Sequence, residues 1–281
     1  MKNLISSCLW FNGNAAEAAQ FHCETFPNSQ IVHSDEITTH YELNGYALTA
    51  LNGGSQYRIN PAISFFVYCG SEAEIDRLYE VLSAGGHVLM PLDKYPWTTK
   101  YAWVEDRFGV SWQLDIDDIK VEQKIVPSML FADQKYTLVQ EAYDHYASII
   151  DPAMFLMSLP YPISAGVPLG TLQFAQFKLN GTVFNAMSNN SKMQFDFSPA
   201  TSFVLQCDTQ AEIDHCWDKL IAAGEANMGG WLVDKFGISW QVIPSQLSQF
   251  LSNPATSKAV MERMLQMKKI EIAALEEAAV A

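Results

Sequence analysis

The sequence predicts an α+β fold of two tandem domains, each made of two modules in the order strand, helix, strand, strand, strand. Two observations predict it. The segment WVEDRFGVSWQLD at residues 103–115 returns as WLVDKFGISWQVI at residues 231–243, with Trp, Asp, Phe, Gly, Ser, Trp and Gln in register. Each half of the 281-residue chain also carries short apolar runs, bounded by turn residues, before and after helix-like segments.

The internal repeat extends beyond that segment. Three further pairs of segments match: 8–11 with 129–132, 41–54 with 177–190, and 63–76 with 201–214. Their uneven spacing indicates an insertion in the second half near residues 157–170 and extra residues in the first half near residues 87–100. A chain of this length commonly forms two domains. We therefore predict domains at 1–123 and 124–250, followed by a C-terminal helix within 251–281.

The elements of the first half are expected in a fixed order: a strand at 4–11, a helix at 14–26, strands within 30–54, a strand at 62–69, a helix from Ser71, and strands ending at 110–116. A Glu three residues after the capping residue indicates capping boxes at Asn14, Ser71 and, in the second half, Thr209. The C-terminal helix is expected to begin near Asn253 and Pro254, with an apolar stripe at spacings of three and four.

The composition excludes several classes of partner and site. The chain has 17 basic and 31 acidic residues, a net charge of −14 that repels nucleic acid and anionic membrane surfaces. No apolar run approaches the ~18 residues of a membrane span, and the N-terminal apolar run is too short for a secretory signal. Five cysteines without C-x-x-C spacing argue against a disulfide framework and a thiolate zinc site. We expect a cytoplasmic protein without nucleic-acid or membrane partners.

The sequence resembles the PhnB-like branch of the vicinal oxygen chelate superfamily, which includes glyoxalases, bleomycin resistance proteins and extradiol dioxygenases. The similarity covers nearly the whole chain, through CLWFNGNAAEAAQFHCETFPNS from residue 8, DRFGVSWQ and DKFGISWQ in the two halves, and MLQMKKIEIAALE near the C-terminus. Members of this group carry the label 3-demethylubiquinone-9 3-methyltransferase. The sequence does not support methyl transfer. No predicted strand is followed by a Gly-rich turn of the kind that S-adenosylmethionine usually needs. We expect no cofactor.

The resemblance implies tandem glyoxalase-like domains whose modules form a half-open cup of strands, with helices outside. Metal-dependent relatives hold a divalent ion with His, Glu or Gln side chains on four cup strands. The matching positions are Ser6 or Cys8, Thr49, Ser64 and Gln113 in the first half, and Pro127 or Met129, Asn185, Ser202 and Gln241 in the second. Such small or neutral side chains bind divalent cations weakly. We therefore predict no metal site.

Alternation along each strand predicts which side chains line the cup. The predicted lining is Trp10, Thr49, Ser64 and Gln113 in one half, and Phe131, Asn185, Ser202 and Gln241 in the other. Trp112 and Trp240 have the opposite parity to the glutamines, so their indoles should pack against the helices. Trp10 and Phe131 are expected as apolar pocket walls, with core packing as the alternative.

The predicted function is binding of a small, uncharged or weakly polar molecule in the cup, without a full metal site. Two alternatives stay open. One is a metal-dependent lyase, isomerase or dioxygenase that uses Gln113 or Gln241 with a rim histidine, such as His33 or His40. The other is a drug-sequestering protein like the resistance proteins that share the implied fold. The sequence does not decide whether the protein is an enzyme. Because relatives pair modules between subunits, the duplication predicts an internal pseudo-dimer and leaves a homodimer open.

Overall fold

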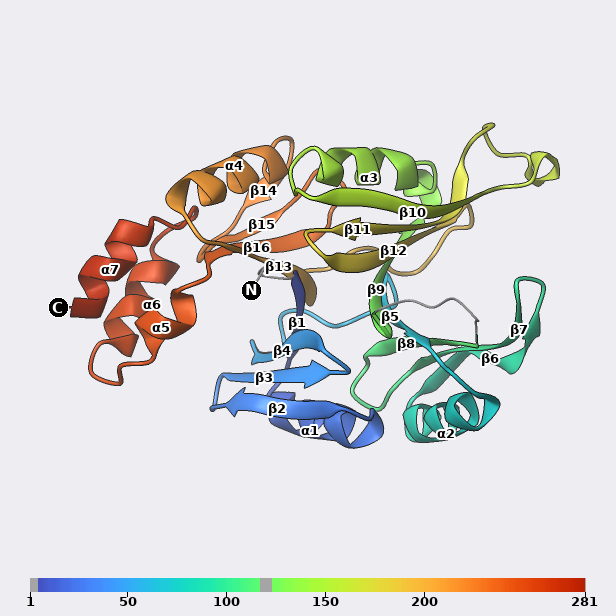
Figure 1. The fold of residues 1–281 in the computed structure, drawn as a ribbon, viewed down its shortest axis with the longest axis horizontal. Helices are drawn as coiled ribbons and strands as arrows, with labels where there is room; N and C mark the ends of the chain where they lie inside the picture. Colours follow the sequence, from blue (N-terminus) through green and yellow to red (C-terminus); the bar gives the residue numbers. More distant parts are fainter. Residues whose placement is uncertain (1–4, 117–122, 281) are drawn as a thin grey trace.

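The computed structural model describes residues 5–116 and 123–280, and its strands form two eight-stranded mixed sheets (Figure 1). Sheet A has the order β14-β15-β16-β13-β1-β4-β3-β2. Its strands are β1 (Ser6–Phe11), β2 (Ser29–Ser34), β3 (Thr38–Leu43), β4 (Tyr46–Asn52), β13 (Thr201–Cys207), β14 (Glu225–Ala226), β15 (Trp231–Val233) and β16 (Ser239–Pro244). Sheet B has the order β10-β11-β12-β9-β5-β8-β7-β6. Its strands are β5 (Ile63–Tyr68), β6 (His87–Tyr95), β7 (Thr98–Glu105), β8 (Ser111–Asp115), β9 (Ile125–Ala132), β10 (Ala153–Pro160), β11 (Leu172–Leu179) and β12 (Thr182–Asn189).

Four helices cover the outer faces of the sheets, with α3 and α4 on one side of the molecule and α1 and α2 on the other (Figure 1). They are α1 (Ala15–Thr25), α2 (Glu72–Ser83), α3 (Val139–Ala147) and α4 (Gln210–Leu220). Short 3₁₀ turns lie at Asp133–Lys135 and Ile163–Ala165, and α5 (Leu247–Leu251), α6 (Ser257–Leu265) and α7 (Ile272–Val280) follow the last strand. No helix within the described residues has both the length and the apolar character needed to cross a membrane. The predicted α+β fold of repeated strand-helix-strand modules is confirmed.

Each sheet joins modules from different halves of the sequence. In sheet A, β1 of the first module pairs antiparallel with β13 of the fourth. In sheet B, β5 of the second module pairs antiparallel with β9 of the third. The segment 117–122, next to the predicted domain boundary at 123/124, lies outside the described residues. The sequence analysis expected one set of lining residues in each half of the chain. Instead, the face of each sheet combines strands of both halves.

The repeated segment at residues 103–115 and 231–243 is built around a buried aspartate in each copy. The Asp106 carboxylate, 2% exposed, accepts hydrogen bonds from the backbone amides of Phe108 (2.8 Å) and Val110 (3.1 Å). Its other oxygen accepts from Trp112 Nε1 at 2.8 Å and lies 2.8 Å from His22 Nε2. One carboxylate thus fixes the turn before β8 and ties the indole to α1, with the indole on the helix side as predicted.

Asp234 repeats this arrangement in the second half. Its carboxylate accepts from the backbone amides of Phe236 and Ile238, from Trp240 Nε1 at 3.0 Å and from Tyr146 Oη at 2.6 Å. Burial raises the pKa of Asp234, and these hydrogen bonds oppose that rise. The motif that repeats most clearly in the sequence therefore stabilises the core of each half.

Two predictions about helix ends are wrong. Asn14 precedes α1, but its side chain makes no capping hydrogen bond, and Asn52 Oδ1 instead accepts from the Ala15 amide at 3.0 Å. The predicted single C-terminal helix is divided into α6 and α7 by residues 266–271. There, the Met267 carbonyl accepts a hydrogen bond from the Gly229 amide at 2.7 Å, so the segment between the two helices contacts the loop before β15. The box at Thr209 forms in full.

Candidate functional site

Four polar side chains lie together on the inner face of sheet A, the face away from the helices. They are Cys8, Thr49, Ser202 and Gln241, from β1, β4, β13 and β16. Cys8 is paired with Thr49 on one side and with Ser202 on the other. Gln241 Nε2 donates to Ser202 Oγ at 3.0 Å. We call these four residues the sheet A quartet.

The sheet B quartet is its counterpart: Ser128, Asn185, Ser64 and Gln113, from β9, β12, β5 and β8. Ser128 is paired with Asn185 and with Ser64, as Cys8 is paired in sheet A. Gln113 Nε2 donates to Ser64 Oγ at 2.7 Å. Six of the predicted lining residues therefore lie in matching positions, three in each quartet, and each quartet draws on both halves of the sequence.

The prediction that Phe131 lines the cup is wrong. Phe131 is 0% exposed and packs in the helix-side core, with its ring 5.3 Å from Phe197 and 6.1 Å from Phe236. The sequence alignment matched Cys8 with Met129, whereas the strand pairings match Cys8 with Ser128. A shift of one residue along a strand moves every side chain to the opposite face.

Aromatic side chains of the protein itself fill the inner face of sheet B. Phe66 lies 5.7 Å from Tyr68, 6.2 Å from Tyr101 and 6.2 Å from Phe174, measured between ring centroids. Tyr101 Oη donates to Gln113 Oε1 at 2.5 Å. Three members of the sheet B quartet are also predicted lining residues, and all three are 0% exposed: Ser64, Gln113 and Asn185. Ser64, Gln113 and Asn185 all form hydrogen bonds within the protein, whereas the buried Ser128 Oγ has no partner among the described residues.

The inner face of sheet A is more open. Trp10, Thr49 and Gln241 are each half-buried. The Trp10 indole meets Trp231 at 6.3 Å and Tyr57 at 5.2 Å, both edge to face, and its Nε1 donates to the Gly54 carbonyl at 2.8 Å. These aromatic rings stand beside the polar quartet, in which Thr49 and Gln241 are half-buried whereas Cys8 and Ser202 are buried. Trp10 is on the face where the sequence predicted it.

The position of Trp10 depends on Gly53. A Cβ atom at residue 53 would lie 2.1 Å from the nearest ring atom of Trp10, well inside van der Waals contact. Any larger residue would therefore displace the indole. Trp231 and Tyr57 were missed as lining residues. Trp231 begins the repeated segment and is paired with Gln241, so its position in the repeat was the available signal.

Two histidines stand at the rim of sheet A. His40 Nδ1 lies 2.9 Å from Thr49 Oγ1, and the His33 ring stacks 6.3 Å from that of His40. His33 Nε2 lies 3.4 Å from a carboxylate oxygen of Asp35. Burial lowers the pKa of His40, and repulsion by His33 lowers it further. His40 is therefore neutral at pH 7 and available as a hydrogen-bond partner for the quartet.

The side chains of the quartets do not fit a divalent metal ion. They offer hydroxyl, amide and thiol groups, and none is a carboxylate or an imidazole. Burial raises the pKa of Cys8 to about 11, so this thiol is protonated at neutral pH and is a poor ligand. The residues that the structure describes contain no group of three or more His, Cys, Asp or Glu side chains able to hold a metal.

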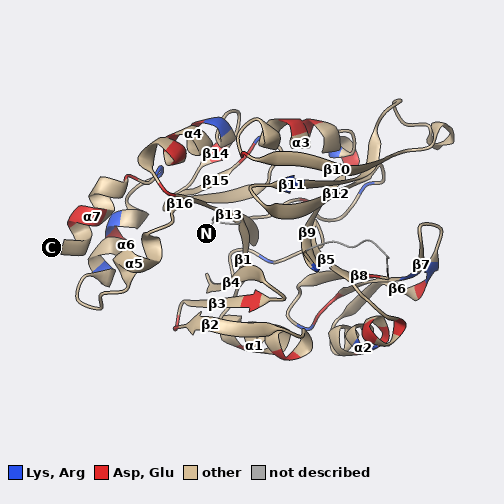
Figure 2. Ribbon diagram, in the orientation of Figure 1, with Lys and Arg blue, Asp and Glu red and all other residues tan. Residues whose placement is uncertain are grey.

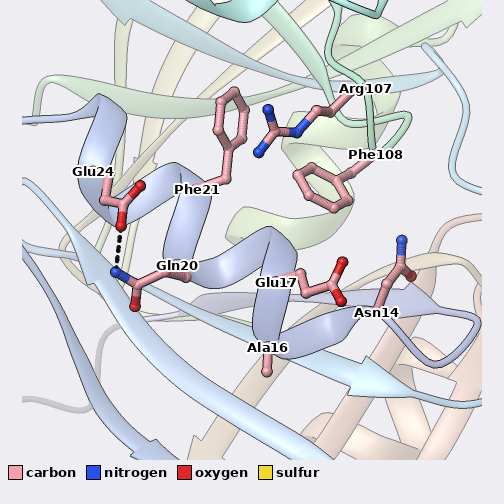
Figure 3. Close-up of a pocket in the computed structure, with 8 residues that line it drawn as sticks. All are labelled: Asn14, Ala16, Glu17, Gln20, Phe21, Glu24, Arg107 and Phe108. Carbon is pink, nitrogen blue, oxygen red and sulfur yellow. Dashed lines mark hydrogen bonds between the residues drawn. The ribbon is translucent and has the colours of Figure 1, made fainter.

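A separate hollow of about 730 Å³ lies outside the sheets, along α1 (Figure 3). Arg107 stacks there 4.2 Å from the centroid of Phe21 and 5.1 Å from that of Phe108. Exposed side chains of α1, including Glu17 and Glu24, form much of its wall. None of the predicted lining residues reaches this hollow, which is an open surface feature.

Charged residues are distributed unevenly over the fold. Asp and Glu gather on the outer helices, while most strands carry few charges (Figure 2). Glu42 on β3 is an acidic exception close to the rim, where it is paired with Ala47. A largely uncharged inner face with aromatic walls suits a ligand of low charge.

Comparison with known proteins places the chain in a family. The model of the 3-demethylubiquinone-9 3-methyltransferase family matches residues 3–115 and again residues 123–243. The chain belongs to this family. A solved PhnB protein from Bacillus cereus is 34% identical over 40% of this chain and 98% of its own, with a TM-score of 0.38. No curated protein matches the chain.

Two other solved structures that resemble this 3-demethylubiquinone-9 3-methyltransferase family member have glyoxalase in their names. Glyoxalase I from Zea mays is 9% identical over 90% of this chain and 95% of its own, with a TM-score of 0.58. A glyoxalase-related enzyme from Fulvimarina pelagi is 19% identical over 40% of this chain and 87% of its own, with a TM-score of 0.33. The similarity to the maize protein supports the glyoxalase-like fold predicted from the sequence.

Proposed function

We propose that the protein binds a small molecule on the inner face of sheet A, beside Trp10 and Trp231 and over Thr49, Ser202 and Gln241. One observation carries the proposal. The same quartet positions exist in both sheets, but aromatic side chains bury them in sheet B, whereas Thr49 and Gln241 in sheet A are half-buried. A polar floor beside aromatic walls is the usual composition of a small-molecule site.

The ligand that this face suits is flat and uncharged. Trp10 and Trp231 supply ring surfaces, and hydroxyl and amide groups supply hydrogen bonds without charge. An anionic ligand is disfavoured because Glu42 lies near the rim and the chain carries a net charge of −14. Aromatic drugs fall within this class, so sequestration of such a drug is one form that the function can take.

The proposal is binding without metal-dependent turnover. The quartets lack a carboxylate or imidazole, and the neutral His40 accompanies Thr49 at the rim. The family name refers to methyl transfer, but no strand within residues 5–116 and 123–280 is followed by a Gly-rich turn suited to S-adenosylmethionine. A metal-dependent lyase, isomerase or dioxygenase is the alternative that the test must distinguish.

We also propose that the protein works in the cytoplasm as an internal pseudo-dimer. All five cysteines are free thiols, which suits a reducing compartment. Both sheets pair one module of each sequence half, in the way that two copies of a shorter chain would. A further homodimer of the whole chain would be detected by sedimentation of the purified protein.

A thermal-shift screen of uncharged aromatic compounds tests the proposed binding. We expect a hit whose stabilising effect is lost in Trp10→Ala and reduced in Gln241→Ala. Trp103→Phe in sheet B serves as the matched control, and the compound should still stabilise this variant. Parallel samples with added nickel, zinc, iron or manganese test the alternative. Stoichiometric metal in protein purified without chelator, or hits that ignore Trp10 and Gln241, would contradict the proposal.

A further inference from the structure

Ser239 carries a buried hydroxyl on the inner face of sheet A. Ser239 is paired with Ser202 on β13 and with Val233 on β15, and it stands two residues before Gln241 on the same face. It is 1% exposed, and its Oγ has no hydrogen-bond partner among the described residues. Buried hydroxyl groups without a partner are rare because they lose their hydrogen bonds to water. The hydrogen-bonding capacity of this hydroxyl is therefore unused within the described residues.

Sheet B shows what the equivalent hydroxyl holds. Ser111, two residues before Gln113, accepts a hydrogen bond from Trp103 Nε1 at 2.7 Å. Trp103 is paired with Gln113, as Trp231 is paired with Gln241 in sheet A. A ring N–H thus satisfies the serine in the filled sheet.

Trp231 does not play this part in sheet A. Its ring stands edge to face with Trp10, 6.3 Å between centroids, and no hydrogen bond joins it to Ser239 in the part of the chain that the structure describes. The two sheets therefore have the same strand register, the same serine and the same tryptophan, but of the two matched serines only Ser239 lacks a donor.

We propose that the ligand of sheet A is a flat aromatic or heteroaromatic molecule with a polar hydrogen on its ring, which it donates to Ser239 Oγ. The inference rests on the proposed function, and it narrows the ligand to indole-like, azole-like or phenol-like molecules. The ring N–H or O–H takes the role that Trp103 Nε1 has at Ser111, and the ring packs against Trp10 and Trp231.

The neighbouring polar groups are already engaged. Gln241 Nε2 donates to Ser202 Oγ, and Thr49 Oγ1 lies within hydrogen-bond distance of His40. Ser202 and Thr49 thus have hydrogen-bond partners on this face, whereas Ser239 has none among the described residues. The hydroxyl oxygen of Ser239 can accept a hydrogen bond. An uncharged ligand with a polar hydrogen can donate that bond, so no charged group has to be buried.

Indole and benzofuran test the inference, because the two rings have the same outline and only indole has an N–H. Ligand-observed NMR titration should show that the protein binds indole about 5-fold more tightly than benzofuran, the ratio expected for one neutral hydrogen bond. Ser239→Ala should abolish this preference by weakening indole alone, with benzofuran unchanged. The matched variant Ser111→Ala should keep the preference.

Thermal unfolding of the two variants gives an independent measurement. Ser239→Ala removes a hydroxyl without a partner and should not lower Tm, whereas Ser111→Ala removes the acceptor of Trp103 and should lower it. Equal binding of the two probes, or a preference for indole that survives Ser239→Ala, would overturn the assignment of Ser239 while leaving binding in sheet A intact. If neither probe binds, the proposed function fails together with this inference.

Discussion

Sheets A and B have the same architecture but differ in what occupies the inner face. In sheet B, Phe66, Tyr68 and Tyr101 cover the quartet, and Gln113 uses both ends of its amide in hydrogen bonds to Ser64 and Tyr101. In sheet A, Val204 takes the position of Phe66, because it is paired with Gln241 as Phe66 is with Gln113. The side chain at this position is therefore smaller in sheet A and aromatic in sheet B.

The comparison teaches how one scaffold can serve two purposes. The outer cores share one arrangement, a buried aspartate that holds a tryptophan and a turn. The inner faces have diverged, since sheet B uses aromatic packing for stability whereas sheet A keeps polar groups within reach of solvent. Substitutions at matched positions should therefore affect stability in sheet B and binding in sheet A.

The largest expected effect comes from Phe66→Ala. Phe66 is 6% exposed and packs among three aromatic rings, so its truncation should lower the free energy of unfolding by about 3–5 kcal/mol. Val204→Ala is the matched change in sheet A, and it removes fewer buried carbons and should cost less. Urea unfolding measures both. Equal losses would show that sheet B is not filled more tightly than sheet A.

The next effect separates the two glutamines. Gln113→Ala leaves Tyr101 Oη and Ser64 Oγ buried without their partner, at a cost of about 1–3 kcal/mol for each group left unsatisfied. Gln241→Ala exposes Ser202 to a half-open face, where water can replace the lost bond, so stability should change by less. Urea midpoints decide the order, and a larger loss for Gln241 would reverse the assignment of the open sheet.

A smaller effect is expected from Gly53→Ala. The new methyl group would overlap the Trp10 ring, so the indole must move, and overpacking of this kind typically costs about 1–3 kcal/mol. Binding of an aromatic ligand in sheet A should weaken more than stability does. The control is Gly70→Ala, since Gly70 has no positive φ and a Cβ there would meet only a side-chain oxygen of Glu74, at 3.7 Å. Unchanged ligand affinity in Gly53→Ala would remove Trp10 from the site.

The smallest effect is the titration of His40. Its pKa is lowered in the folded protein by burial and by His33, so the unfolded chain binds the proton more readily. Stability from this group is therefore present above the unfolded value of about 6.5 and is lost as the pH falls through the folded pKa. His33→Ala should raise the pKa of His40, and Asp35→Ala should lower it. NMR titration of the imidazole Cε1–H signals measures both, and opposite shifts would contradict the rim geometry.

Much of the fold could be predicted because the repeat is strong. Strand parity placed Trp112 and Trp240 on the helix side, and it placed Gln113 and Gln241 on the inner faces. These residues follow a glycine turn whose position in the strand is unambiguous. Where the sequence provides such an anchor, alternation alone decides the face of each side chain.

The remaining features depend on contacts between distant segments. The pairing of β1 with β13 and of β5 with β9 joins residues that lie far apart along the chain, so local patterns did not indicate it. Phe131 was misplaced because the apolar run of β9 has no turn near it to fix the register. Asp106 was overlooked, since nothing local shows that a charged residue is buried against His22.

The central claim is that a small molecule binds at sheet A and that sheet B is closed. Two-dimensional ¹H–¹⁵N NMR of the tryptophan indole groups tests it directly, because Trp103 and Trp231 are matched reporters on the two inner faces. Addition of an aromatic ligand from the screen should shift the Nε1–H signals of Trp10 and Trp231 and leave that of Trp103 unchanged. A shift of Trp103 with Trp10 and Trp231 unmoved would contradict the account.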